Sequence, residues 1–344
     1  MMKPMVILLL ILLNFVIGNV YAVDKPTKVI DTEKKISFPR DLFAHNGFNR
    51  EWWYFSGVIT TKDKHPYAYN FTVFKTFNNY TTIFQMSDLI TAKKLGYTED
   101  TVVDNKDYSH SLNLKIGQSS LSYDQKNKTW HISINKPNYQ FELALKPIRP
   151  YVLNGKNGYI DQSSGGKSAY YSAQNMDASG KLVIDGHSAT VSGKGSWMDR
   201  QWGNFGESPA AFNYYWLSCR FDDNTGLMLY TFLDAKQDPI SKYATGTYQD
   251  AQGKGYLVTD LLGPPINTFY KANNDSNYYN LEWLVRVPSK KLAFRIMPIT
   301  GNQFVISKTQ GSFWEGATQI YGAKAGYCFL EGSYGNELIK SRDS

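Results

Sequence analysis

The sequence predicts an all-β protein made of two consecutive antiparallel barrels, and three observations lead to that prediction. Most of the chain consists of short segments in which apolar and polar residues alternate, which is the period of a half-buried strand. Turns rich in glycine and asparagine separate these segments, and few windows keep a helical period for about ten residues. Aromatic residues make up 15% of the chain, with 25 Tyr, 19 Phe and 8 Trp, which suits large sheets or an aromatic-lined cavity.

The N-terminus has the pattern of a signal peptide over residues 1–22. Lys3 precedes the apolar run "PMVILLLILLNFVIGNV", and the ending "VYA" predicts cleavage before Val23. An uncleaved anchor is the alternative, but the run is short for a spanning helix and Asn14 and Gly18 interrupt it. No later segment has the roughly 18 apolar residues that a spanning helix needs. We therefore expect an exported protein, periplasmic or secreted, without a stable membrane anchor.

The rest of the chain divides into a lead-in and two predicted domains. Residues 23–41 are polar and lack a steady period, so we expect them to be extended. Residues 42–207 form the predicted first barrel, and residues 208–344 form the second. Residues 151–174 break the strand rhythm and are either a surface loop or a flap over a site. The clearest strand segments are "WWYFSGVIT", "YAYNFTVFKTF", "TWHISIN" and "YQFELALKP" in the first domain, and "NYYWLSCRFDD", "TGLMLYTFLD", "KLAFRIMPI" and "SFWEGATQIYG" in the second.

Charge and motif content exclude several classes of function. The formal net charge of +7 is spread along the chain, which is typical of a mildly basic surface and not of nucleic-acid binding. The five histidines form no H-x-x-x-H or H-x-H pair, and two cysteines cannot make a zinc cage. The chain has no G-x-S-x-G motif, and "GGKS" lacks the upstream glycine of a phosphate-binding loop. We expect neither a metal nor any other cofactor.

The two cysteines leave two interpretations open. Export places the chain in an oxidising compartment, where Cys219 and Cys328 can form a disulfide, although their spacing does not predict one. Alternatively, Cys219 is a small core residue of the strand "YYWLSCRF".

Carboxyl groups next to indoles are the strongest candidates for chemistry. A carboxyl group that is held against aromatic surface loses hydration of its charged form, so its pKa rises and it can donate a proton near neutral pH. The candidates are Glu51 before Trp52 and Trp53, Asp199 between Trp197 and Trp202, Glu282 before Trp283, and Glu315 after Trp314.

Asp199 has two interpretations. Arg200 can neutralise it in a structural ion pair, as Arg50 can neutralise Glu51, and this would favour the carboxylate. On a strand, however, neighbouring residues point to opposite faces. Alternation would place Trp197, Asp199 and Gln201 on one face, and Met198, Arg200 and Trp202 on the other. Tyr170 and Tyr171 can supply a phenol that orients a ligand or steadies charge, or they can simply be packing residues.

Several motifs occur together and in a fixed order: "HNGFNREWWYFSG" at 45–57, "GSWMDRQWG" at 195–203 and "FWEGATQIYG" at 313–322, with related segments between them. With these motifs the chain resembles the AttH-like family, also called predicted secreted hydrolases, which is related to the carotenoid 1,2-hydratases (hydroxyneurosporene synthases). The resemblance implies two lipocalin-like, or calycin, barrels with a ligand site in or between them. It also implies an apolar ligand such as a lipid or an isoprenoid.

The resemblance also implies roles for particular residues. In the hydratases an Asp shortly after an aromatic residue is thought to protonate a carbon–carbon double bond, and "WMD" places Asp199 at that position. Trp197 stands where the hydratases carry a tyrosine, and "SAYYS" departs from their pattern because it lacks the upstream histidine. The resulting catalytic candidates are Asp199, Tyr171 and Trp197, and the ligand-binding candidates are Glu51, Trp53, Tyr170, Trp202, Trp216 and Glu315.

Two functions follow from this pattern. The first is an enzyme that uses Asp199 as a general acid to add water to an apolar alkene or to rearrange it, with aromatic faces stabilising the carbocation. The second is a carrier that binds a lipid or an isoprenoid unchanged. A glycan-binding protein is a third class, but the tryptophans lie within strands and not on loops.

Overall fold

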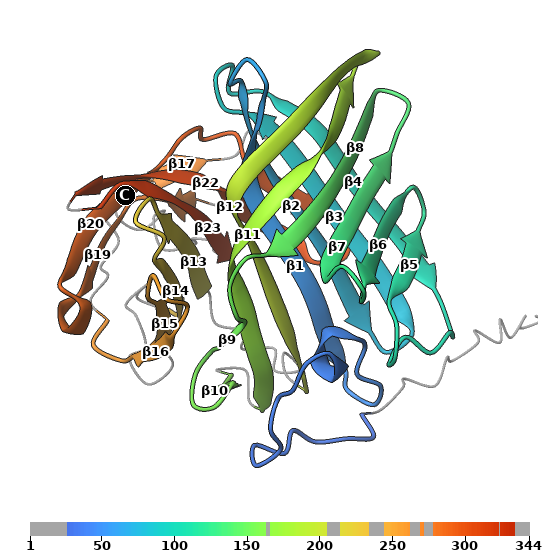
Figure 1. Cartoon of the computed structure of the whole chain (residues 1–344), viewed down its shortest axis with the longest axis vertical. Helices are drawn as coiled ribbons and strands as arrows, with labels where there is room; N and C mark the ends of the chain where they lie inside the picture. The colour runs from blue at the N-terminus through green and yellow to red at the C-terminus, as the bar shows by residue number, and fades with distance from the viewer. Residues whose placement is uncertain are drawn as a thin grey trace, which may run out of the picture.

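The chain forms two curved antiparallel sheets that lie side by side (Figure 1). The computed structural model describes residues 26–162, 166–204, 214–233, 244–261, 269–271, 278–322 and 324–333. Each sheet closes on itself like a barrel, so the expected all-β class and the two antiparallel calycin-like barrels are confirmed. The predicted signal peptide and its cleavage before Val23 lie outside the described residues.

The first sheet is an up-and-down barrel in which the first strand pairs with the last. Its main path is β4-β3-β2-β1-β12-β11-β8-β7-β6-β5, and β9 and β10 pair with β11. Strands β4 and β5, the two ends of the path, lie next to each other. The strands are β1 (Arg50–Thr61), β2 (Pro66–Thr76), β3 (Asn79–Asp88), β4 (Lys94–Val103), β5 (Asn113–Ile116), β6 (Ser119–Asp124), β7 (Thr129–Asn135), β8 (Tyr139–Pro147), β9 (Val152–Leu153), β10 (Tyr159–Asp161), β11 (Lys167–Ile184) and β12 (His187–Gly203).

The second sheet repeats this arrangement. Its path is β16-β15-β14-β13-β23-β22-β20-β19, so the first strand β13 again pairs with the last strand β23, and β21 pairs with β22. Strands β17 and β18 form a separate pair. The strands are β13 (Tyr214–Phe221), β14 (Gly226–Phe232), β15 (Thr245–Gln249), β16 (Gly255–Val258), β17 (Phe269–Lys271), β18 (Tyr278–Asn280), β19 (Trp283–Val287), β20 (Leu292–Pro298), β21 (Phe304–Ser307), β22 (Gly311–Gly322) and β23 (Gly326–Ser333).

Helical structure is sparse in the described ranges. Two short 3-10 turns occur there, η1 (Arg40–Leu42) and η3 (Pro288–Lys290). Over the same ranges no helix is long and apolar enough to cross a membrane.

Burial patterns show which strands separate the barrels. Strand β8 alternates buried and exposed residues, because one of its faces fills the first barrel and the other faces solvent. Strands β1 and β3 and the C-terminal half of β12 are buried on both faces. One face of β1 carries Trp53 and Phe55 into the core of the first barrel. The other face carries Tyr54 into an apolar cluster shared with Trp216 of the second barrel.

Polar contacts reinforce the junction between the barrels. Arg220 of β13 donates hydrogen bonds from Nε to the backbone oxygen of Gly195 at 2.6 Å and from Nη2 to Oγ of Ser56 at 2.9 Å. Gly195 has a φ of +75°, a conformation that glycine adopts without steric cost. Gln85 of β3 donates a hydrogen bond to the backbone oxygen of Gln303 at 3.1 Å. The two barrels therefore share one continuous buried contact zone.

The structure settles two questions that the sequence left open. Cys219 and Cys328 form a disulfide inside the second barrel, where they are register partners on β13 and β23. Residues 151–174 are not wholly a loop or a flap, since β9, β10 and the start of β11 lie within them. Their short strands pair with β11, which the glycine-rich sequence concealed.

Candidate functional site

Two rows of side chains face the contact zone between the barrels. In the first barrel, Asp199 of β12 has Tyr54 of β1 and Ser172 of β11 as its register partners. In the second barrel, Trp216 of β13 has Tyr230 of β14 and Glu331 of β23 as its partners. Glu315 of β22 continues the second row, because it lies opposite Glu331. Tyr54 and Trp216 connect the rows through an edge-to-face contact with centroids 5.1 Å apart.

Asp199 lies at the centre of a compact hydrogen-bond network. The hydroxyl of Tyr170 donates to Oδ2 at 2.6 Å, and Nε1 of Trp197 donates to Oδ1 at 2.7 Å. The hydroxyl of Ser172 also donates to Oδ1. Trp216 donates from Nε1 to the Tyr170 hydroxyl at 2.9 Å, so the second barrel contributes to the network. Asp199 is thereby held rigidly, with only 3% of its surface exposed.

Burial raises the pKa of Asp199 to about 6, although the hydrogen bonds from Ser172, Tyr170 and Trp197 and the charge of Arg220 act in the opposite direction. Loss of hydration penalises the carboxylate more than these contacts stabilise it. A carboxyl group with this pKa is partly protonated near neutral pH, so it can donate a proton to a ligand and recover it afterwards.

Glu315 and Glu331 form a carboxyl pair beside Asp199. Asn70 of β2 donates a hydrogen bond to Oε2 of Glu315, and Tyr214 of β13 donates one to Oε1 of Glu331. Burial raises the pKa of Glu331 to about 7, opposed by Tyr214 and assisted by the charge of Asp199. Burial and the charge of Glu331 raise the pKa of Glu315 well above its usual range. The two groups therefore avoid being charged at the same time.

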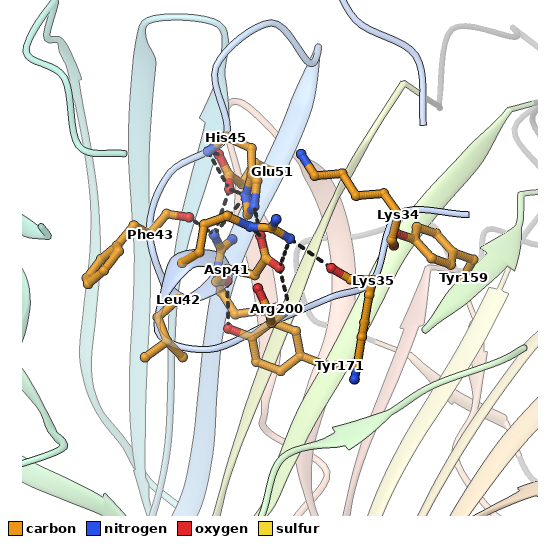
Figure 2. A network of polar contacts seen from close by, with 12 residues as sticks. Lys34, Lys35, Asp41, Leu42, Phe43, His45, Glu51, Tyr159, Tyr171 and Arg200 are labelled. Atoms are coloured by element: carbon orange, nitrogen blue, oxygen red, sulfur yellow. Dashed lines mark hydrogen bonds and ion pairs between the residues drawn. The ribbon is translucent and has the colours of Figure 1, made fainter. Parts of the chain in front are cut away.

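Arg200 lies on the opposite face of β12 from Asp199 and points into the first barrel, as strand alternation predicts. Figure 2 shows Arg200 together with Glu51, His45 and Phe43. Its Nη2 lies 2.6 Å from Oε1 of Glu51 and donates to the backbone oxygen of Phe43 at 2.6 Å. His45 lies between Glu51, at 2.7 Å from Nδ1, and Asp41, at 2.9 Å from Nε2. The proposed ion pairs of Asp199 with Arg200 and of Arg50 with Glu51 are therefore wrong, because Arg200 and Glu51 pair with each other.

The network around Arg200 is suited to stability and not to proton donation. Burial alone would raise the pKa of Glu51, but Arg200, His45 and Lys75 lower it to about 2. The Arg200 guanidinium stacks over Trp53 with 3.9 Å to the ring centroid, and His45 stacks on Trp202 at 3.8 Å. Glu51 is thus charged at neutral pH, and it joins the N-terminal segment to the barrel through His45.

The structure brings some of the predicted site residues together and separates others. Trp197, Tyr170 and Trp216 belong to the Asp199 network, and Glu315 lies in the facing row. Tyr171, Glu51, Trp53 and Trp202 lie on the opposite face, inside the first barrel. The hydroxyl of Tyr171 donates to the backbone oxygen of Asp41 at 2.9 Å and does not reach Asp199. Tyr170 occupies the position expected of Tyr171, because adjacent residues of β11 point to opposite faces.

Sequence reasoning missed several residues of the site, namely Ser172, Tyr54, Tyr214 and Glu331. Two signals in the sequence could have found Ser172 and Glu331. Ser172 follows Tyr170 by two positions and therefore shares its face. The tripeptides "WEG" at 314–316 and "LEG" at 330–332 occur in consecutive strand segments, which is the pattern of a facing glutamate pair.

A concave feature lies in the barrel formed by β13–β23. Its cavity volume is about 40 Å3, and its walls are mainly apolar. Leu217, Leu229, Trp283 and Val285 line it, and Tyr230 connects it to the row that contains Trp216. Over the described part of the chain, no group of three or more His, Cys, Asp or Glu side chains is placed to hold a metal ion.

This fold and site define a class of two-barrel, lipocalin-like proteins with a polar centre enclosed between the barrels. The AttH-like family model matches residues 29–332, so the chain belongs to the AttH-like family. No curated protein matches it.

Solved structures share this fold over nearly their whole length. A protein assigned as AttH from Nitrosomonas europaea is 23% identical, with a TM-score of 0.81 over 90% of this chain and 100% of that one. Kievitone hydratase from Nectria haematococca is 17% identical, with a TM-score of 0.71 over 90% and 97% of the two chains. The protein CghA is 12% identical, with a TM-score of 0.58 over 93% and 97%.

Proposed function

We propose that this protein binds an apolar, lipid-like or isoprenoid-like molecule between its barrels and protonates a carbon–carbon double bond of that molecule through Asp199. The single observation that carries the proposal is the environment of Asp199. Its carboxyl is buried among three hydrogen-bond donors, and burial raises its pKa to about 6. That is the property required of a general acid at neutral pH.

Asp199 can act as the only acid in this reaction, because the proton that it donates is returned to it in the last step. The π electrons of the alkene take the Asp199 proton to form a new C–H bond, which leaves a carbocation on the neighbouring carbon. A water oxygen then bonds to that carbon, and its extra proton returns to the Asp199 carboxylate. The faces of Trp197, Trp216 and Tyr54 stabilise the cation through their π electrons. The result is hydration, and loss of a different proton from the cation would give isomerisation instead.

The shared fold is a second support for a hydratase-type activity. Kievitone hydratase has the same two-barrel fold, and its name states that it is a hydratase. Roles transfer between such distant proteins by analogy alone. The geometry of Asp199 is therefore the main support for the proposal, and the shared fold is secondary.

Export is part of the proposal. The signal-peptide pattern of residues 1–22 supports it, and so does the disulfide between Cys219 and Cys328, because disulfides persist in oxidising compartments. N-terminal sequencing of the protein from an extracytoplasmic fraction tests this, with Val23 expected as the first residue. Recovery of the intact N-terminus from the cytoplasm would contradict it.

A carrier that does not change its ligand is the second candidate. It is favoured by the apolar walls of the pocket in the second barrel, since lipocalin-like barrels hold small apolar ligands against such walls, and the pocket of about 40 Å3 would have to widen to admit one. In that case Asp199 would only join the strands through its hydrogen bonds.

An Asp199→Asn variant separates the two candidates. Wild type and variant are incubated with the total apolar extract of the source cells, and the extract is compared by mass spectrometry before and after. We expect wild type to convert at least one component to a product of equal mass or heavier by one water, and the variant to bind that component unchanged. Equal conversion by both proteins would disprove the acid role. Binding without conversion by wild type would favour the carrier.

A further inference from the structure

The irregular insert before β11 is fastened to that strand beside Tyr170. The backbone N–H of Asn154 donates to the oxygen of Tyr170 at 3.0 Å, and the N–H of Tyr170 donates to the oxygen of Gly158 at 2.7 Å. Gly155 allows the turn between these contacts, because its φ is +68° and an added Cβ would lie 2.4 Å from the backbone oxygen of Tyr159. The insert therefore holds Asn154 against β11.

The side chain of Asn154 directs the hydroxyl of Ser172. Asn154 is buried, and its Nδ2 donates a hydrogen bond to Oγ of Ser172 at 2.7 Å. An amide nitrogen can only donate, so the single hydrogen of the Ser172 hydroxyl cannot point to Asn154. That hydrogen is instead donated to Oδ1 of Asp199. Asn154 thus acts on Asp199 through Ser172, without touching it.

The two oxygens of Asp199 differ in the number of donors that they receive. Oδ1 accepts from Ser172 and from Nε1 of Trp197, which occupies both of its lone pairs. Within the described ranges Oδ2 accepts from Tyr170 alone, so one of its lone pairs remains. Trp216 donates to the Tyr170 hydroxyl, whose own hydrogen therefore goes to Oδ2. A proton can bind at Oδ2 without displacing a donor, whereas at Oδ1 it would displace Ser172 or Trp197.

We propose that Asp199 holds and donates its proton at Oδ2, and that Asn154 is a positioning residue that keeps Oδ1 occupied through Ser172. The inference rests on the proposed function, because it takes Asp199 as the acid and adds the reacting atom and the residue that prepares it. In the hydration step the Oδ2–H bond breaks as the new C–H bond forms, and the proton of the added water later returns to Oδ2.

The surroundings of Asp199 predict how loss of the contact from Ser172 changes its pKa. Burial raises this pKa to about 6, and the hydrogen bond from Ser172 is the strongest effect in the opposite direction. A substitution at Asn154 leaves the other neighbours in place, so a rise in the pKa reports on Ser172. The titratable and charged groups that lie opposite Asp199 or act on its charge are Tyr54 of β1, Tyr170 of β11, Arg220 of β13 and Glu331 of β23.

The first test measures the pKa of Asp199 by 13C NMR titration of the full-length protein without a ligand. In Ser172→Ala we expect the pKa to rise by about one unit, because one donor is lost. In Asn154→Leu we expect about half that rise, because the Ser172 hydroxyl remains but can turn away. Adding Asn154→Leu to Ser172→Ala should change nothing further, since Asn154 acts only through that hydroxyl.

Asn280→Leu is the matched control for these titrations. Asn280 is also buried, and its side-chain oxygen, like that of Asn154, has no partner in the part of the chain that the structure describes. It lies on β18 of the separate strand pair, so its replacement should leave the pKa of Asp199 unchanged.

The second test locates the proton in wild-type protein. Neutron diffraction from deuterated crystals, kept about one pH unit below the measured pKa of Asp199, shows hydrogen positions when most of the acid is protonated. We expect deuterium on Oδ2 of Asp199, and the deuterium of the Ser172 hydroxyl directed to Oδ1.

Each part of the inference can be contradicted separately. An unchanged pKa in Asn154→Leu, or the same rise with and without the Ser172 hydroxyl, would overturn the positioning role of Asn154. Deuterium on Oδ1 of Asp199 would overturn the assignment of the proton. If Asn154→Leu fails to fold, Asn154→Ala replaces it, and the direction of the Ser172 hydroxyl in the neutron map still decides the role. No substrate is used, so an absence of conversion would contradict the proposed function alone.

Discussion

Asp199 and Arg200 are neighbours in sequence, yet the structure gives them opposite surroundings. Asp199 has hydrogen-bond donors without a paired cation among the described residues, and Arg200 has a carboxylate and backbone oxygens. Of the two interpretations of the sequence, strand alternation predicted this separation and the ion pair did not, because alternation is a local property of a strand. It did not predict that Glu51 is the partner of Arg200, because a pairing between positions so far apart depends on the register of β1 with β12.

Replacing Tyr170 tests the network at the level of one hydroxyl. In Tyr170→Phe the carboxylate of Asp199 loses one hydrogen-bond donor, so its pKa should rise above the present value by up to about one unit. Trp216 also loses the acceptor for its Nε1, which should lower stability by about 1 to 3 kcal/mol. The measurement is a 13C NMR titration of labelled aspartate carboxyls, assigned with Asp199→Asn.

Tyr171→Phe is the matched control for this experiment. Its hydroxyl donates to the Asp41 backbone on the other face, so the titration of Asp199 should stay unchanged. A change in the control as large as that in Tyr170→Phe would show that the hydroxyl of Tyr170 is not what tunes Asp199.

At the scale of elements, the pairing of first and last strands explains both the disulfide and the acid pair. Strand β23 lies between β13 and β22, so Cys328 faces Cys219 on the inner side and Glu331 faces Glu315 on the outer side. The strand segments could be recognised from alternation and turn residues. The pairing of strands in the sheet could not be predicted in the same way, because strands that are adjacent in the sheet can be distant in sequence. Here 109 positions separate the two cysteines.

The disulfide should contribute strongly to the stability of the second barrel. The disulfide closes a loop of 109 positions and thereby restricts the unfolded chain. Without the bond the unfolded chain has more conformational entropy, so the free energy of unfolding should be lower by about 2 to 5 kcal/mol. Urea unfolding of Cys219→Ala/Cys328→Ala measures the change. Reduced wild-type protein is the control, since it lacks the bond but keeps the side-chain volume. An unchanged unfolding midpoint after reduction would contradict the prediction.

At the scale of the whole molecule, two buried regions favour opposite protonation states of their carboxyl groups. The network in the first barrel requires charged carboxylates, since Arg200 and His45 lower the pKa of Glu51 to about 2 against the effect of burial. The zone between the barrels favours protonated ones, since burial raises the pKa of Asp199 to about 6 and of Glu331 to about 7. These opposite preferences for the protonated and the charged carboxyl group should determine how stability depends on pH.

We expect stability to be greatest in mildly acid solution. Groups with raised pKa values stabilise the fold fully below about pH 4, where they are also protonated in the unfolded chain, and this contribution is lost as the pH rises to about 7. Glu51 acts in the opposite sense, and its contribution is lost as the pH falls from about 4 to about 2. A pKa that differs by one between the folded and the unfolded chain corresponds to about 1.4 kcal/mol of stability.

Unfolding midpoints in urea between about pH 3 and pH 8 measure this profile. Glu331→Gln should flatten the decline between about pH 5 and pH 8, because the amide has no proton to lose. A wild-type midpoint that rises steadily over that interval, or a variant with the same decline as wild type, would contradict the assignment of the raised pKa values.

The first-to-last pairing of each barrel also sets an order of assembly during synthesis. The Asp199 network takes its first-barrel members from β11 and β12, but Glu331, Phe329 and Cys328 all lie on β23, the last strand that the structure describes. A nascent chain that stops short of β23 therefore cannot close the second barrel, oxidise Cys219 with its native partner or complete the carboxyl pair. Closure of the fold and completion of the site are thus the same event, and a free Cys219 thiol would mark chains in which neither has occurred.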